Sequence, residues 1–140
     1  MSFTLPQLRQ AIEAELVTRL PTWTVSRLSY ELFPGADAMA IVARAFAVGL
    51  GDREFLPRGR GGLATTMTQV LIRFTSILRA DDHVTSLDEA LTLEAALVVA
   101  VAAIGNPPVT LIGSSGSVVG DGTVYLGELR TTVLHAYPTT

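Results

Sequence analysis

Cysteine and lysine are both missing from this chain of 140 residues, so all ten of its basic side chains are arginines. Without cysteine the chain can form no disulfide, no catalytic thiolate and no cysteine-ligated metal site. Charged residues are also few, at 16% of the chain, and the formal net charge is −3. Because proteins that bind nucleic acids gain much of their affinity from basic side chains on phosphates, this charge balance argues against that class.

Long hydrophobic runs are missing as well. The longest apolar run is the ten-residue segment 95–104, whereas a helix needs about 20 residues to cross a bilayer, so we expect no contact with a membrane. No secretory signal is recognisable in the sequence, and we expect the protein to be made and to fold in a reducing cytosol. Apolar residues nevertheless make up 49% of the chain, which excludes intrinsic disorder and predicts a single domain over residues 1–140.

The start of the chain has the pattern of an amphipathic helix. Thr4 can serve as the N-cap, Pro6 suits the first turn, and Gln7 stands at the position of a capping box. Apolar residues then recur at steps of three and four and form one stripe. The stripe consists of Leu5, Leu8, Ile12, Leu16 and Leu20. Pro21 ends the predicted helix, because the residue before a proline disfavours helical angles.

Two segments predict the strands of a long β-hairpin. Residues 39–48 are mostly apolar on both faces, and residues 63–78 alternate between apolar and polar side chains. The residues between them, 49–62, are rich in glycine and arginine. A connection of this length without structure of its own is usually functional or disordered, and we interpret it as a mobile hairpin loop.

Side chains within this loop are candidates for an assembly contact, because a flexible segment can become ordered when it binds a partner. The candidates are Arg53, Glu54, Phe55, Arg58 and Arg60. The arginines would pair with acidic groups of a neighbouring subunit or line a pore that faces DNA, and the acidic residues between them favour the protein contact. A hairpin tip without an assembly role is the alternative interpretation of the same residues.

A second helix is predicted from residue 86 to about residue 104. Ser86 and Glu89 have the spacing of a capping box, and the glycine, asparagine and prolines at 105–108 end the helix. Its last ten residues are apolar on every side, which is typical of a helix that is covered on every side. One small chain covers only part of such a helix, so we expect a second protein surface on it. The residues predicted to face this partner are Leu97, Val98, Val101 and Ile104.

The last third of the chain predicts strands over residues 109–112 and 123–137, with a flexible loop from Gly113 to Gly122 between them. The Gly-Ser-Ser-Gly sequence that opens this loop invites a phosphate-binding interpretation, but the chain has no lysine and the next segment is a turn and a strand rather than a helix. Asp81, Asp82 and His83 lack the spacing of metal ligands. We therefore predict no metal site, no cofactor and no catalytic residue, and we expect the protein not to be an enzyme.

Together these elements predict an α+β fold, a mixed or mostly antiparallel sheet with a long β-hairpin and two helices packed on a face. In this order they resemble the tail terminator proteins of long-tailed phages, the lambda-like minor tail protein U group. The resemblance covers nearly the whole chain. It rests on the N-terminal helix, the 39–48 strand, the loop sequence Arg-Glu-Phe-Leu-Pro-Arg at 53–58, the 66–78 strand, the Ser-Leu-Asp-Glu-Ala-Leu helix opening at 86–91 and the closing strand.

The resemblance implies a structural virion protein without catalytic residues. Such a subunit would form a ring, expected to be hexameric, on the end of the tail tube, where it stops tube polymerisation and presents a surface for joining the head. It implies the tail tube protein and head–tail connector proteins as partners, with DNA only passing through the lumen. The protein would be assembled in the host cytoplasm and located in the virion tail. The loop 113–122 has no counterpart in the family pattern.

Two alternatives remain open at this stage. The first is another head–tail connector or tail-tube protein, because these also use small subunits and hairpins. The second belongs to a different class, a small-ligand-binding domain or an enzyme that uses the loop from Gly113 to Gly122.

Overall fold

The computed structural model describes residues 2–26, 44–56 and 65–138, and within these ranges the chain forms two helices and a five-stranded sheet. The elements are α1 (Leu5–Arg19), β1 (Thr24–Val25), β2 (Ala45–Leu56), β3 (Thr65–Ile77), α2 (His83–Ala102), β4 (Thr110–Val119) and β5 (Val124–Ala136). The strand order is β1-β2-β3-β5-β4. Only the short β1 runs parallel to its neighbour, and the other pairs are antiparallel.

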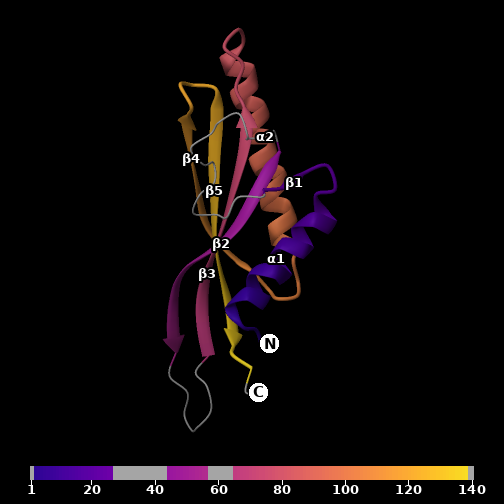
Figure 1. The fold of residues 1–140 in the computed structure, drawn as a ribbon, viewed down its shortest axis with the longest axis vertical. Coiled ribbons are helices and arrows are strands. Elements are labelled where there is room, and N and C mark those ends of the chain that lie inside the picture. The colour runs from indigo at the N-terminus through magenta and orange to yellow at the C-terminus, as the bar shows by residue number, and fades with distance from the viewer. Residues whose placement is uncertain (1, 27–43, 57–64, 139–140) are drawn as a thin grey trace.

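Figure 1 shows a long, twisted sheet with both helices on the same side. The hairpin of β2 and β3 extends to the lower end of the view, and the start of the described chain lies beside the end of β5, where Ser2 bridges to Ala136. The predicted α+β class, the mostly antiparallel sheet, the long hairpin and the two helices on one face are therefore confirmed.

The core lies between the helices and one face of the sheet. Both helices contribute aliphatic side chains, and the central strands contribute Phe46, Phe74 and a row of branched residues. Among the largest fully buried side chains are Phe46, Phe74, Leu8, Ile12, Leu16, Ile72, Leu97, Val70, Val101 and Val133. Trp23 packs at the edge of this core, with its ring centroid 5.9 Å from that of Phe74 and 6.4 Å from that of Phe46.

The predicted first helix is confirmed. The Thr4 side chain accepts a hydrogen bond from the Gln7 backbone at 3.3 Å, and the Gln7 side chain accepts one from the Thr4 backbone at 2.9 Å. This reciprocal pair is the capping box that the sequence predicts. Leu8, Ile12, Leu16 and Leu20 are buried against the sheet, so the apolar stripe sets the face that α1 presents to the core.

The β-hairpin is longer than predicted, and the loop expected from residue 49 is wrong for residues 49–56. These residues continue β2 and pair with β3 as far as Leu56 opposite Thr65. The register shifts between Leu50 and Arg53, where a side chain on Gly51 would collide with that of Gln69. The Gln69 side chain instead accepts a hydrogen bond from the Asp52 backbone at 3.4 Å. Gly51 therefore marks a bulge in a strand. The rest of the expected loop, residues 57–62, lies outside the described residues, as do residues 39–43 of the expected strand.

The start of α2 differs from the prediction as well. The helix begins at His83 with Asp82 as its N-cap, whose carboxylate accepts a hydrogen bond from the Thr85 backbone at 3.3 Å. Ser86 is buried inside the first turns, where its hydroxyl contacts the Asp82 carbonyl at 2.9 Å. Glu89 forms an ion pair with Arg79 at 3.2 Å rather than reaching back to a cap. The predicted capping box at Ser86 and Glu89 is thus wrong by one helical turn.

Most of the loop predicted from Gly113 to Gly122 is also wrong, since β4 continues to Val119 and the turn is confined to residues 120–123. Gly120, Asp121 and Gly122 adopt positive φ angles of 61°, 57° and 85° there. Within the strands, Gly116 lies opposite Gly127, and the rings of Tyr125 and Phe74 cover these two positions. The glycines thus serve close packing rather than flexibility.

The packing at Gly127 predicts a specific loss of stability. A Cβ atom at this position would collide with the Phe74 ring, so we expect Gly127→Ala to lower the free energy of unfolding by about 1–3 kcal/mol, as overpacked cores do. Gly105→Ala is the matched control, because a Cβ atom there meets nothing within 4 Å. Urea denaturation of both variants measures the difference, and equal stabilities would contradict this account of the core.

Candidate assembly surfaces

The second half of α2 has two apolar sides, and the described part of the chain covers only one of them. Leu97 and Val101 are fully buried in the core, Ile104 just beyond the helix end is buried with them, and Val98 is partly buried against the same cluster. The prediction that these four residues face a partner is therefore wrong. The apolar character of the whole segment does not by itself indicate which side meets the sheet, and in the structure the larger side chains lie on the sheet side.

The opposite side of the same helix remains exposed and apolar. Val99 is 70% exposed, and its neighbours on this side are alanines. The exposed residues are Ala95, Ala96, Val99, Ala102 and Ala103, and we call them the exposed α2 face. In the first half of the helix the corresponding side carries polar residues such as Thr85 and Asp88 together with the exposed Val84 and Leu91, so this side becomes wholly apolar only in the second half. The small residues on one side and large ones on the other were the sequence signal for this face.

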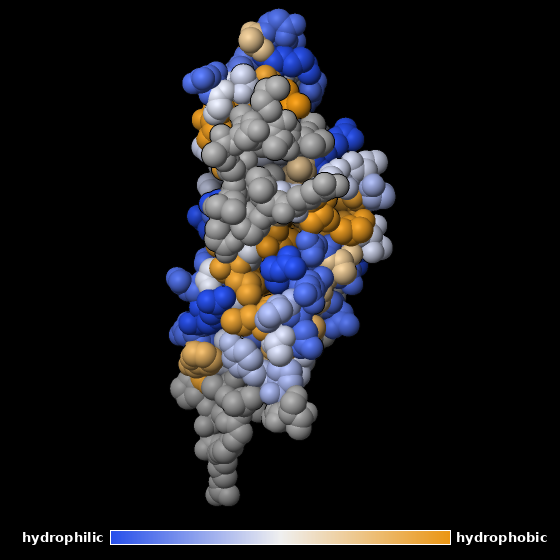
Figure 2. All heavy atoms as spheres, in the orientation of Figure 1, coloured by the Kyte–Doolittle hydropathy of each residue, from blue (hydrophilic) through white to orange (hydrophobic). Residues whose placement is uncertain are grey.

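A shallow groove runs along the exposed α2 face. It has a volume of about 720 Å³ and is lined by the C-terminal end of α1 together with α2. The lining residues are Arg19, Leu20, Thr92, Ala95, Ala96, Val99, Ala100 and Ala103. Figure 2 shows that apolar side chains reach this view of the surface in patches among hydrophilic ones. Small side chains along a groove allow another protein backbone or helix to approach closely.

The charged candidates of the hairpin lie elsewhere in the molecule. Arg53, Glu54 and Phe55 stand on the exposed end of β2, at the lower end of the view in Figure 1 and away from α2. The Phe55 side chain is 64% exposed, and its ring lies 6.3 Å from that of Tyr137. Arg58 and Arg60 lie outside the described residues. The structure thus does not bring the hairpin residues and the α2 residues into one site.

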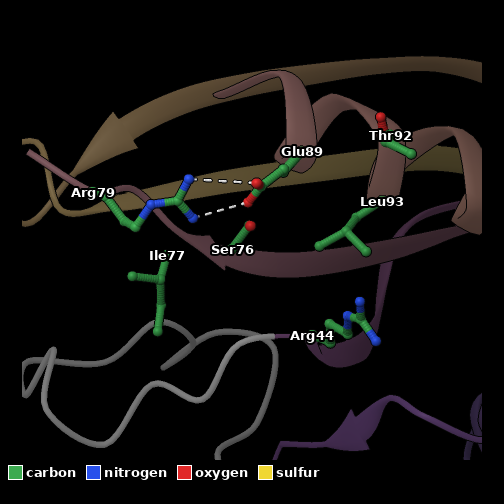
Figure 3. A pocket seen from close by; sticks show the side chains of 7 residues that line it. All are labelled: Arg44, Ser76, Ile77, Arg79, Glu89, Thr92 and Leu93. Atoms are coloured by element: carbon green, nitrogen blue, oxygen red, sulfur yellow. Dashed lines mark hydrogen bonds and ion pairs between the residues drawn. The ribbon is translucent and has the colours of Figure 1, made fainter. Parts of the chain in front are cut away.

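A second hollow, of about 420 Å³, lies between the end of β3 and the first half of α2. Its lining side chains are Arg44, Ser76, Ile77, Arg79, Glu89, Thr92 and Leu93, and Figure 3 shows Arg79 pointing toward Glu89. Two hydrogen bonds of 3.2 and 3.4 Å join these two residues. The hydrogen bonds and charge of Glu89 raise the pKa of Arg79, so its guanidinium is engaged in holding the β3–α2 connection.

The Asp-Asp-His sequence at residues 81–83 has local structural roles. Asp82 caps α2, and His83 Nε2 lies 3.2 Å from the carbonyl oxygen of Gly122, which ties the start of α2 to the β4–β5 turn. Among the described residues no group of three or more acidic or histidine side chains has an arrangement that could hold a metal ion.

His135 is a buried polar side chain that the sequence did not single out. Its Nε2 atom forms a hydrogen bond of 2.7 Å with the Thr68 hydroxyl, on the neighbouring strand β3. Its Nδ1 atom is buried and has no hydrogen-bond partner among the described residues. Burial lowers the pKa of His135 below its ordinary value of 6.5, because the charged form loses its hydration.

This burial predicts a loss of stability in mild acid. The unfolded chain takes up a proton on His135 as the pH falls through 6.5, whereas the folded chain resists it. The free energy of unfolding should therefore decrease from pH 7.5 to pH 5. We expect His135→Gln to show a smaller decrease than the parent, measured by urea denaturation at the two pH values. His83→Gln, which removes the exposed histidine, should show the same decrease in the free energy of unfolding as the parent. An equal decrease in the two variants would contradict the assignment of this pH dependence to His135.

No protein-family model matches the chain, and no curated protein matches it. Within the part of the chain that the structure describes, no helix is long and apolar enough to cross a membrane.

Proposed function

We propose that this protein is a structural subunit that closes into a ring on the end of a phage tail tube, as a tail terminator. The observation that carries the proposal is the exposed α2 face, which keeps apolar side chains in water on a helix whose other side already fills the core. Contiguous exposed apolar surface of this kind marks sites of protein contact. A ring places a neighbour on each side of every subunit, so the face would be covered throughout the assembly.

The composition of the exposed α2 face supports a protein partner. The exposed side of α2 carries no charged residue from Ala95 to Ala103, and a shortage of charge is characteristic of the centre of protein interfaces. Arg19, which pairs with Glu15 at 3.2 Å, lies at the border of the groove, so the charged groups stand at the rim of the proposed contact. The alternation of small side chains with Val99 suits a helix or loop of a neighbouring subunit.

The exposed end of the β2–β3 hairpin supports a second contact. Arg53 and Glu54 carry opposite charges there, and Phe55 exposes an aromatic ring. Mixed charges beside an aromatic ring fit a protein surface better than a phosphate backbone, and aromatic and arginine side chains are enriched at interfaces. In the proposal this end of the hairpin meets a neighbouring subunit or the tail tube, and Arg58 and Arg60 belong to the same contact.

The resemblance to tail terminators gives the assembly its expected form. We propose a hexameric ring with one side on the tail tube and the other toward the head–tail connector proteins, located in the virion tail and without catalytic activity. DNA would touch it only while passing through the lumen. Most of the loop on which the ligand-binding alternative was based is strand β4, and we therefore favour the structural subunit.

Substitution on the exposed α2 face tests the ring directly. We expect Val99→Glu to raise the concentration needed for assembly at least about tenfold, because an unpaired carboxylate buried in a contact costs several kcal/mol and 1.4 kcal/mol corresponds to a factor of ten. Val17→Glu on α1 is the control, since Val17 is also exposed but does not line the groove. Light scattering and negative-stain imaging give the mass and shape. A parent protein that stays monomeric and binds no tube ends would contradict the proposal.

The position of the ring on the tube can be tested in assembling phage particles. Loss of a terminator leaves tube growth unchecked, so particles made without this protein should carry overlong tails in electron micrographs. Supplying the parent protein should restore the normal tail length, and supplying the Val99→Glu variant should not. Absence of tails would instead identify a tube protein, and tails of normal length that lack heads would identify a connector.

A further inference from the structure

The outer strand β4 presents an open edge that the proposed ring contact does not use. β4 is the last strand in the sheet order, and among the described residues it pairs only with β5. Eight of its ten residues are exposed. Among the described residues, the backbone N–H and C=O groups on the outer side of β4 therefore have no partner strand.

This edge lacks the charged side chains that protect the other side of the sheet. There the outermost strand, β1, has only two residues, and the exposed end of β2 carries Asp52, Arg53 and Glu54 beside a bulge. Such charges and irregularities prevent other strands from adding to an edge. β4 has a bulge between Leu111 and Gly113 but contains no charged residue and no proline. It also exposes Ile112 (57%) and Val118 (48%).

We propose that β4 pairs with β4 of a second copy of this chain, antiparallel and about a two-fold axis at Ser115. The strand reads almost the same from both ends around this residue, with two apolar residues at each end and only glycine and serine between them. Pairing centred on Ser115 places Ile112 opposite Val118, the two exposed aliphatic side chains on either side of the glycines and serines. Apolar side chains that face each other across antiparallel strands stabilise the pair.

A second copy fits this edge better than an unrelated strand. A two-fold axis makes each strand its own complement, and two copies of one edge strand related by such an axis run antiparallel. The serines and glycines at the centre keep the contact free of bulky or charged side chains. The result is a sheet that continues from one copy into the next and covers both exposed edges. This contact is separate from the exposed α2 face, so the β4 pairing and the proposed ring can be tested independently of each other.

Single cysteines test the register, because the chain has no cysteine of its own. Ser115→Cys places two thiols across the axis on strands whose opposed Cα atoms lie about 4.5–5.5 Å apart, within the range of a disulfide. Ser117→Cys is the matched control, the same exposed residue type on the same strand. In the proposed register it lies opposite Gly113, so the two copies of residue 117 are four residues apart, about 13 Å, which is too far for a disulfide.

Mild oxidation of the two full-length variants, followed by a non-reducing gel, should give a covalent dimer with Ser115→Cys at least about tenfold faster than with Ser117→Cys. Equal rates, or no dimer from Ser115→Cys, would overturn the proposal.

A second measurement does not depend on cysteine. Val118→Lys should lower the mass found by light scattering at concentrations where the parent is dimeric, and Val17→Lys, at an equally exposed valine on α1, should not. An unchanged mass for Val118→Lys would also overturn the proposal, whether or not rings form.

Discussion

The burial of one face of the β-sheet beneath two helices is the interaction on which the rest of this structure depends. β3 lies at the centre, paired along its length with both β2 and β5. Val70, Ile72 and Phe74 on this strand are completely buried under side chains of α1 and α2. Removing a side chain of this size from water contributes about 1.5–3 kcal/mol, so neither the hairpin nor the helices would keep their arrangement without this contact.

The same contact determines what remains outside. Once Leu97 and Val101 point into the core, the geometry of a helix turns Val99 and Ala103 away from it. The apolar run of residues 95–104 thus meets two different surroundings, the sheet on one side and water on the other. In the first half of α2 the outer side mixes polar residues with the exposed Val84 and Leu91, and only the second half presents the exposed α2 face, which has no polar residue. The proposed ring follows from this local excess of apolar surface.

Elements with a clear hydrophobic period could be predicted from the sequence. The first helix with its Thr4–Gln7 cap and the strands near residues 65–77 and 124–136 follow the periods of a helix and of strands with one buried face. The segments 49–56 and 113–119 could not, because glycine, serine and charged residues favour loops locally. In the structure, pairing with β3 and β5 overrides that local preference. Gly116 and Gly127 make room for the rings of Tyr125 and Phe74, a tertiary requirement that has no local sequence signature.

The candidate site shows the same limit. The excess of apolar residues in the second half of α2 could be predicted, but the side that stays exposed depends on how α2 lies on the sheet. Ser86 and Glu89 fit a capping box by spacing alone, yet Asp82 caps the helix one turn earlier and Ser86 becomes buried. His135 gave no signal, because a lone histidine in a strand becomes unusual only when its neighbour Thr68 is known from the sheet register.

The central claim is that copies of the chain cover the exposed α2 face, and the reactivity of a thiol on that face tests it most directly. Because the chain has no cysteine, Val99→Cys and Val17→Cys each introduce a single reporter at an exposed valine. In concentrated protein, the account predicts that a thiol reagent modifies the Val99→Cys variant at least about tenfold more slowly than the Val17→Cys variant. Dilution below the assembly concentration should make the two modification rates equal. Equal rates at every concentration would show that the face stays in water and would contradict the account.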